Sequence, residues 1–114
     1  MRKMAWCGLI VLLSLGVAHA SSAQPRTVTV PRADAAPAPL ALPAFVFNPQ
    51  GTGPHPAVVM LHGCGGAYGK AGRLNARHQM WGEYLAAQGY VALMLDSFSA
   101  RGYRHICTTK FSER

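Results

Sequence analysis

The chain has 114 residues, of which 11 are Lys or Arg and 4 are Asp or Glu, so its formal net charge is +7 at pH 7. The basic residues are scattered, and no run of them is interleaved with aromatic residues. This pattern disfavours nucleic-acid binding and is typical of a solvated basic surface.

The first 20 residues have the pattern of a secretory signal peptide. Arg2 and Lys3 form a short positive region, and residues 6–17 are predominantly apolar. Residues 18–20, Ala-His-Ala, fit the small-x-small cleavage pattern, and a second candidate site follows residue 23. The apolar stretch is shorter than the ~20 residues that span a bilayer. We therefore predict an exported protein, periplasmic or extracellular, with no stable membrane anchor.

Export leaves two cysteines in the expected mature chain, Cys64 and Cys107. An even number of cysteines in an oxidising compartment favours a disulfide between them. Such a bridge would close a loop of about 43 residues and contribute roughly 4 kcal/mol at most. The alternative that the sequence leaves open is a pair of free, buried cysteines.

Residues 21–43 are rich in Ala and Pro and are predicted to form an extended connection, because proline removes donors from a strand ladder. Within it, the alternating residues 27–30 fit a short edge strand. Residues 44–47 are a stronger strand candidate. Turn-forming residues at 48–54 then lead to an apolar run at 57–61, so the two strands are expected to form a hairpin.

The stretch at residues 57–66 organises the rest of the chain, because an apolar run ends there at His62 and opens into a glycine cluster. The run is typical of a strand buried on both faces of a parallel sheet, and the glycines let backbone N–H groups approach a ligand. A helix is expected to begin near its N-cap, Asn75, and to end at Gly89, before an apolar strand at 91–95. This order predicts a βαβ unit and an α/β fold.

The residues from His62 to Gly66, His-Gly-Cys-Gly-Gly after an apolar strand, resemble the oxyanion loop of α/β-hydrolases. Residues 81–93, followed by Asp96-Ser97-Phe98 and Arg101-Gly102, are similar to the dienelactone hydrolase family, and the resemblance covers roughly residues 42–107. It implies that residues 44–114 are the amino-terminal part of a hydrolase domain. The complete protein would hydrolyse a small ester or lactone through a Cys or Ser nucleophile, a His base and an Asp acid, without a cofactor.

The resemblance also implies roles within the loop formed by His62, Gly63, Cys64, Gly65 and Gly66. Acyl transfer passes through a tetrahedral oxyanion, which fixed backbone N–H groups stabilise by several kcal/mol. One of these donors comes from the loop after the third strand. The N–H of Cys64 is the first candidate for this donor, and that of Gly65 is the next. A tight turn without any ligand is the structural alternative.

The catalytic triad of the family has no match in the chain. No Gly-x-Ser-x-Gly or Gly-x-Cys-x-Gly elbow occurs, so we expect a fragment that is inactive by itself. His62 and Asp96 lie at positions where the family has no triad member, and they are expected to hold loop backbone. Three further residues are candidates to line the site: Tyr68, Arg101 and Arg104.

A dinucleotide-binding βαβ unit of an oxidoreductase is the alternative enzyme. Gly63, Gly65 and Gly69 follow one strand, and Asp96 ends the next, where a ribose-binding acid would lie. However, Tyr68 occupies the position of the third glycine of the motif. The helix is also expected to begin too far along the chain for its N-terminus to meet a phosphate.

Metal binding and non-catalytic ligand binding are two further classes of function to consider. The histidines at 55, 62, 78 and 105, with the two cysteines, lack a recognisable ligand spacing, so no metal site is expected. A non-catalytic exported binding protein is the last alternative. Its glycine loop would bind an anion weakly or bind nothing.

Overall fold

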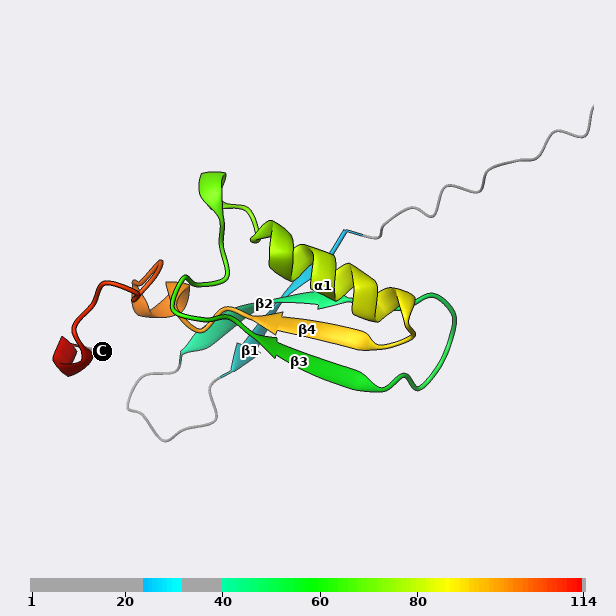
Figure 1. Ribbon diagram of the computed structural model, residues 1–114. Helices are drawn as coiled ribbons and strands as arrows, with labels where there is room; N and C mark the ends of the chain where they lie inside the picture. Colours follow the sequence, from blue (N-terminus) through cyan, green and yellow to red (C-terminus); the bar gives the residue numbers. More distant parts are fainter. Residues whose placement is uncertain (1–23, 32–39, 114) are drawn as a thin grey trace, which may run out of the picture.

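The computed structural model describes residues 24–31 and 40–113, which form a mixed four-stranded sheet and one α-helix (Figure 1). The protein is therefore of the α/β class. The expected signal peptide at residues 1–20, and residues 21–23 and 32–39 of the expected connection, lie outside the described residues. Across the described part of the chain, no helix has the length and apolar character needed to cross a membrane.

The sheet consists of β1 (Arg26–Pro31), β2 (Ala41–Phe47), β3 (Ala57–Leu61) and β4 (Val91–Leu95), in the order β1-β2-β4-β3. β1 pairs antiparallel with β2, which confirms the predicted edge strand. β2 pairs antiparallel with β4, and β4 pairs parallel with β3. The predicted parallel pair of the βαβ unit is therefore confirmed.

The predicted hairpin between β2 and β3 is wrong, because β4 lies between the two strands. Ala92 is opposite Phe47 on one side and opposite Val58 on the other. Ala92 and its β4 neighbour Met94 are fully buried. A strand with such residues is best placed inside the sheet, and the connection at residues 48–56 is long enough to let β2 and β3 separate.

β2 begins earlier than the sequence indicated and contains Pro43. The carbonyl oxygen of Pro43 accepts a hydrogen bond from the N–H of Asp96, at 2.9 Å. In an antiparallel ladder, the N–H and C=O of one residue face the same neighbouring strand. The missing N–H of Pro43 therefore faces the end of β4, where pairing stops at Leu95. Proline costs the sheet little at this position.

The helix α1 (Ala76–Ala87) covers one face of the sheet over β2 and β4 (Figure 1). Its predicted ends are confirmed: the side chain of Asn75 accepts a hydrogen bond from the N–H of Arg77, and Gly89 has a positive φ of 90°. The N–H groups of Gly89 and Tyr90 bond to the last turn, at 3.0 and 3.1 Å, in a Schellman motif. Three 3-10 turns complete the described elements: η1 (Lys70–Gly72), η2 (Ser99–Arg101) and η3 (Phe111–Glu113).

The hydrophobic core lies between α1 and the sheet and includes Phe47, Ala67, Ala92 and Met94. Gly82 is buried in α1 and faces the ring of Phe47, which a Cβ at that position would overlap. The absence of a side chain therefore lets the helix approach the sheet closely.

Strand β3 lies at the edge of the sheet, and the expectation that it is buried on both faces is wrong for this structure. Val59 is 62% exposed and Leu61 is 72% exposed. Both lie on the face opposite α1, since Met60 between them packs against the core. A continuous apolar run does not by itself distinguish a central strand from an edge strand whose outer face is open.

Candidate functional site

The glycine loop, defined here as residues 62–66, leaves the carboxyl end of β3 and forms a tight turn. The N–H of Gly66 donates to the carbonyl oxygen of Gly63 at 3.1 Å, which makes Cys64 and Gly65 the central residues of the turn. Both central residues are exposed. Among the described residues, no hydrogen bond uses the N–H of either of them.

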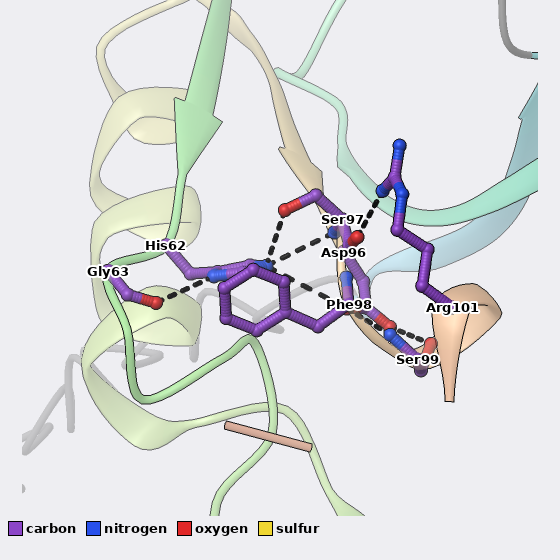
Figure 2. Close-up of polar contacts among 7 residues, drawn as sticks. All are labelled: His62, Gly63, Asp96, Ser97, Phe98, Ser99 and Arg101. Atoms are coloured by element: carbon purple, nitrogen blue, oxygen red, sulfur yellow. Dashed lines mark hydrogen bonds and ion pairs between the residues drawn. The ribbon is translucent and has the colours of Figure 1, made fainter. Parts of the chain in front are cut away.

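The side chain of His62 connects the loop to the end of the neighbouring strand (Figure 2). Its Nδ1 lies 2.8 Å from the carbonyl oxygen of Gly63, and its Nε2 lies 3.1 Å from both N and Oγ of Ser97. A carbonyl oxygen only accepts, so Nδ1 carries the proton and Nε2 accepts from Ser97. The imidazole is buried and contacts the ring of Phe98 edge-on, with centroids 4.4 Å apart. The carboxyl ends of β3 and β4 are thereby fixed to each other.

Asp96 is 1% exposed and holds the backbone that follows β4 (Figure 2). Its Oδ1 accepts from the N–H groups of Phe98 and Ser99, at 3.0 and 3.2 Å, and its Oδ2 accepts from the Ser99 hydroxyl. Oδ1 also lies 3.7 Å from Nε2 of His62. Ser97 and Asp96 thus approach the same imidazole nitrogen. In a triad the acid and the serine use opposite nitrogens, so this cluster supports backbone and does not activate Ser97.

A second segment, residues 104–107, lies on the glycine loop. Cys107 forms a disulfide with Cys64, with the two Cα atoms 4.8 Å apart. The N–H of Ile106 donates to the carbonyl oxygen of Cys64 at 2.8 Å. The carbonyl oxygen of Arg104 lies where a Cβ of Gly66 would be, and Gly66 has a φ of +79°. Glycine is therefore required at position 66 both by the backbone conformation and by the close approach of this segment.

A cleft of about 270 Å³ lies between the glycine loop and the first turn of α1. Its lining residues come from these two elements alone: Gly63, Gly65, Gly66, Asn75, Arg77 and His78. The expectation that the helix N-terminus lies too far along the chain to meet a ligand of the loop is therefore wrong. Gly65 lines the cleft, whereas Cys64, the donor first expected from the sequence, is not among its lining residues.

The helix returns to the loop because the intervening residues fold out and back. Tyr68 and Leu74 form a β-bridge, and the N–H of Gly69 donates to the carbonyl oxygen of Arg73 at 2.8 Å. Chain separation between the glycines and α1 is therefore a poor guide to their distance in space.

The cleft favours negative charge. Arg77 is the cationic residue of its lining, and the N-terminus of α1 carries the positive end of the helix dipole. No carboxylate is among the lining residues. Asn75 uses its side-chain oxygen to cap Arg77 N–H, which leaves the N–H groups of Ala76 and His78 without a hydrogen bond among the described residues. The lining thus includes two residues with free backbone N–H groups, Gly65 and His78, and one cationic residue, Arg77.

Three residues that the sequence suggested for the site lie outside the cleft lining. Tyr68 packs edge-on against Phe45, with ring centroids 5.8 Å apart, and burial followed by the charge of Asp96 raises the pKa of its phenol. Arg101 donates to the carbonyl oxygen of Ser97, and Arg104 contributes its backbone to the contact with the loop.

Sequence reasoning missed Arg77 as a site residue, considered His78 only as a scattered metal donor, and found Asn75 only as a cap. The N-cap at Asn75 could have indicated these residues, because an N-cap marks a helix end whose first N–H groups are open to a ligand.

Within residues 24–31 and 40–113, no group of three or more His, Cys, Asp or Glu side chains could hold a metal ion. The backbone donors and the cationic residue of the cleft suit a carboxylate, a phosphate or a developing oxyanion. No family model matches the chain, and comparison with curated proteins and with solved structures also gives no match.

Proposed function

We propose that the chain is the amino-terminal part of an exported hydrolase of the dienelactone hydrolase type, and that its glycine loop supplies an oxyanion donor. The observation that carries the proposal is the pair of unpaired N–H groups of the exposed residues Cys64 and Gly65, beside a cleft at the N-terminus of α1. In α/β-hydrolases, one oxyanion donor comes from the loop between the third strand and the first helix. The glycine loop likewise lies between β3 and α1 of this chain, which supports the proposal.

We place the principal donor at Gly65, because Gly65 lines the cleft and Cys64 does not. A substrate carbonyl oxygen in the cleft would accept the Gly65 N–H, and this hydrogen bond would strengthen as the oxygen gains negative charge in the tetrahedral intermediate. The helix dipole and Arg77 would favour the same charge. The Gly65 N–H would need no reorganisation during the reaction, because the hydrogen bond from Gly66 to Gly63 already closes the turn.

On this proposal, the nucleophile, the acid and the base come from outside residues 1–114. His62 is engaged at both nitrogens by backbone and Ser97, and both oxygens of Asp96 are engaged by the 98–99 backbone and the Ser99 hydroxyl. The chain alone is therefore expected to hydrolyse p-nitrophenyl acetate no faster than buffer. Turnover well above that background would contradict the absence of a triad.

A nucleotide phosphate is the second candidate ligand, because a glycine loop and a helix N-terminus are the parts of many phosphate sites. The position of α1 favours it. Against it, the carboxylate of Asp96 is 1% exposed and committed to loop backbone, so it is not free to bind a ribose.

The test is a ¹H–¹⁵N NMR titration of the chain with methyl phenylphosphonate, a tetrahedral monoanion that mimics the oxyanion of ester hydrolysis. We expect the Gly65 amide to shift, and Arg77→Gln to weaken binding several-fold. Arg73→Gln is the matched control, since Arg73 is exposed and lies outside the cleft lining.

Two other ligands decide between the proposals. The neutral dimethyl phenylphosphonate carries one more methyl group and no charge, so we expect it to bind more weakly and to shift the Gly65 amide less than the monoanion does. Binding of NADH that is tighter than binding of the phosphonate would favour the nucleotide site. An unshifted Gly65 amide with every ligand would overturn the oxyanion proposal.

A further inference from the structure

The directions of the two free N–H groups are set by two different peptide planes. A peptide unit is planar, so each N–H points opposite to the carbonyl of the preceding residue. The N–H of Cys64 therefore follows the carbonyl of Gly63, and the N–H of Gly65 follows the carbonyl of Cys64. Whatever holds these two carbonyl oxygens also aims the two donors.

The carbonyl of Gly63 is held from within the β3–β4 region. Its oxygen lies 3.1 Å from the N of Gly66 and 2.8 Å from Nδ1 of His62. His62 is in turn fixed by Ser97, and its imidazole is buried. The direction of the Cys64 N–H thus depends on residues next to the sheet.

The carbonyl of Cys64 is held from residues 104–107. The carbonyl oxygen of Cys64 accepts a hydrogen bond from the N–H of Ile106 at 2.8 Å. The sulfur of Cys64 is bonded to that of Cys107, the residue after Ile106. The disulfide is the main restraint on the position of Ile106, because residues 103–108 contain no strand or helix and are mostly exposed. The direction of the Gly65 N–H thus depends on a disulfide that joins Cys64 to a residue 43 positions later in the sequence.

We infer that residues 104–107 position the Gly65 N–H, with Ile106 and Cys107 as positioning residues, and that reduction of the Cys64–Cys107 disulfide weakens anion binding in the cleft. The positioning of the Gly65 N–H follows from the geometry alone, whereas the effect on anion binding rests on the proposed function. A dithiol such as dithiothreitol would break the S–S bond and transfer two electrons and two protons to the sulfurs. The products are two cysteine thiols and the cyclic disulfide of the reductant.

The experiment compares the oxidised and reduced chain, with Cys7→Ser in every sample so that one cysteine pair is present. The readouts are the ¹⁵N order parameters of the Cys64 and Gly65 amides and the Kd for methyl phenylphosphonate. On reduction, we expect the order parameter of Gly65 to fall from about 0.85 to below about 0.6, and that of Cys64 to change much less. We expect the Kd to rise about tenfold, less than the loss from removing an oxyanion donor outright.

Three controls separate positioning from loss of fold. The amides of Ala92 and Met94, which are fully buried in β4, report whether the core is intact. Bridging the two reduced thiols with diiodomethane forms two C–S bonds and releases two equivalents of HI, and the resulting link should restore the Gly65 order and the Kd in the presence of reductant. Arg77→Gln should raise the Kd while leaving the Gly65 order unchanged.

The outcomes are distinct. Unchanged Gly65 order and unchanged Kd on reduction would overturn the inference, as would equal loosening of Cys64 and Gly65. If the oxidised chain fails to bind the phosphonate, the proposed function fails, but the order parameters still decide whether residues 104–107 aim the Gly65 donor.

Discussion

The N–H of Asn75 donates a hydrogen bond of 2.9 Å to the carbonyl oxygen of Ala67. This contact joins the end of the glycine loop directly to the N-cap of α1, so residues 68–74 form a closed excursion. The first turn of the helix is thereby brought against Gly63, Gly65 and Gly66 in the lining of one cleft. Loop donors and helix dipole act on the same space because of this return.

The cap at Asn75 provides a first prediction. Asn75→Ala removes the side-chain acceptor of the Arg77 N–H, and we expect it to lower the free energy of unfolding by about 1 kcal/mol. Asn75→Asp retains an acceptor and places a negative charge at the helix N-terminus, so its stability should stay near that of the parent. Urea unfolding followed by circular dichroism measures both. Equal losses in the two variants would contradict a capping role.

Gly66 and Gly65 provide a matched pair within one turn. Gly66→Ala puts a Cβ onto the carbonyl oxygen of Arg104 at a positive φ, whereas a Cβ at Gly65 meets nothing within 4 Å. We expect Gly66→Ala to lower the free energy of unfolding by about 2 kcal/mol or more and to displace residues 104–107. Gly65→Ala should lower it by less than about 0.5 kcal/mol. Denaturant unfolding and the ¹⁵N shift of Ile106 report the two effects. Similar costs at both positions would show that the contact with Arg104 is unimportant.

Gly82 tests whether packing or helix propensity decides stability in α1. Alanine in a helix interior is favoured over glycine by about 1 kcal/mol, but a Cβ here would overlap the ring of Phe47. Overpacking of a core costs about 1–3 kcal/mol, so we expect Gly82→Ala to be destabilising on balance. The double variant Gly82→Ala, Phe47→Leu should recover part of the loss, which unfolding experiments on all four chains of the cycle measure. A stabilising Gly82→Ala would show that the helix can shift at no cost.

Tyr68 provides a prediction about pH. Burial, followed by the charge of Asp96, raises the pKa of its phenol in the folded chain. Above the ordinary tyrosine pKa of about 10, the unfolded chain loses this proton more readily than the folded chain does. The stability from this group is therefore complete below about pH 10 and falls as the pH rises further. Unfolding experiments between pH 8 and pH 11 should show a smaller decline for Tyr68→Phe, and an equal decline would contradict the raised pKa.

Much of the local structure was predictable from the sequence because it depends on neighbouring residues. The cap at Asn75 and the positive φ at Gly89 follow from the hydrogen-bonding and steric properties of those side chains. The backbone-holding roles of His62 and Asp96 were also expected, from the resemblance of the surrounding sequence to the dienelactone hydrolase family.

The order of the strands was not predictable in the same way. Both β3 and β4 are continuous apolar runs, yet β4 is central and β3 lies at the edge with Val59 and Leu61 exposed. The difference depends on what covers each face, which is a property of the folded chain.

The sequence by itself determined the α/β character of the described chain, the ends of α1 and the presence of a glycine loop after an apolar strand, because these depend on propensities that act over a few residues. Only the tertiary structure decided that Arg77 and His78 share a cleft with Gly65, and that the N–H of Ile106 donates to the carbonyl oxygen of Cys64. These contacts join segments separated by many residues, and they form because strand pairing, the closed excursion at 68–74 and the disulfide bring the segments together.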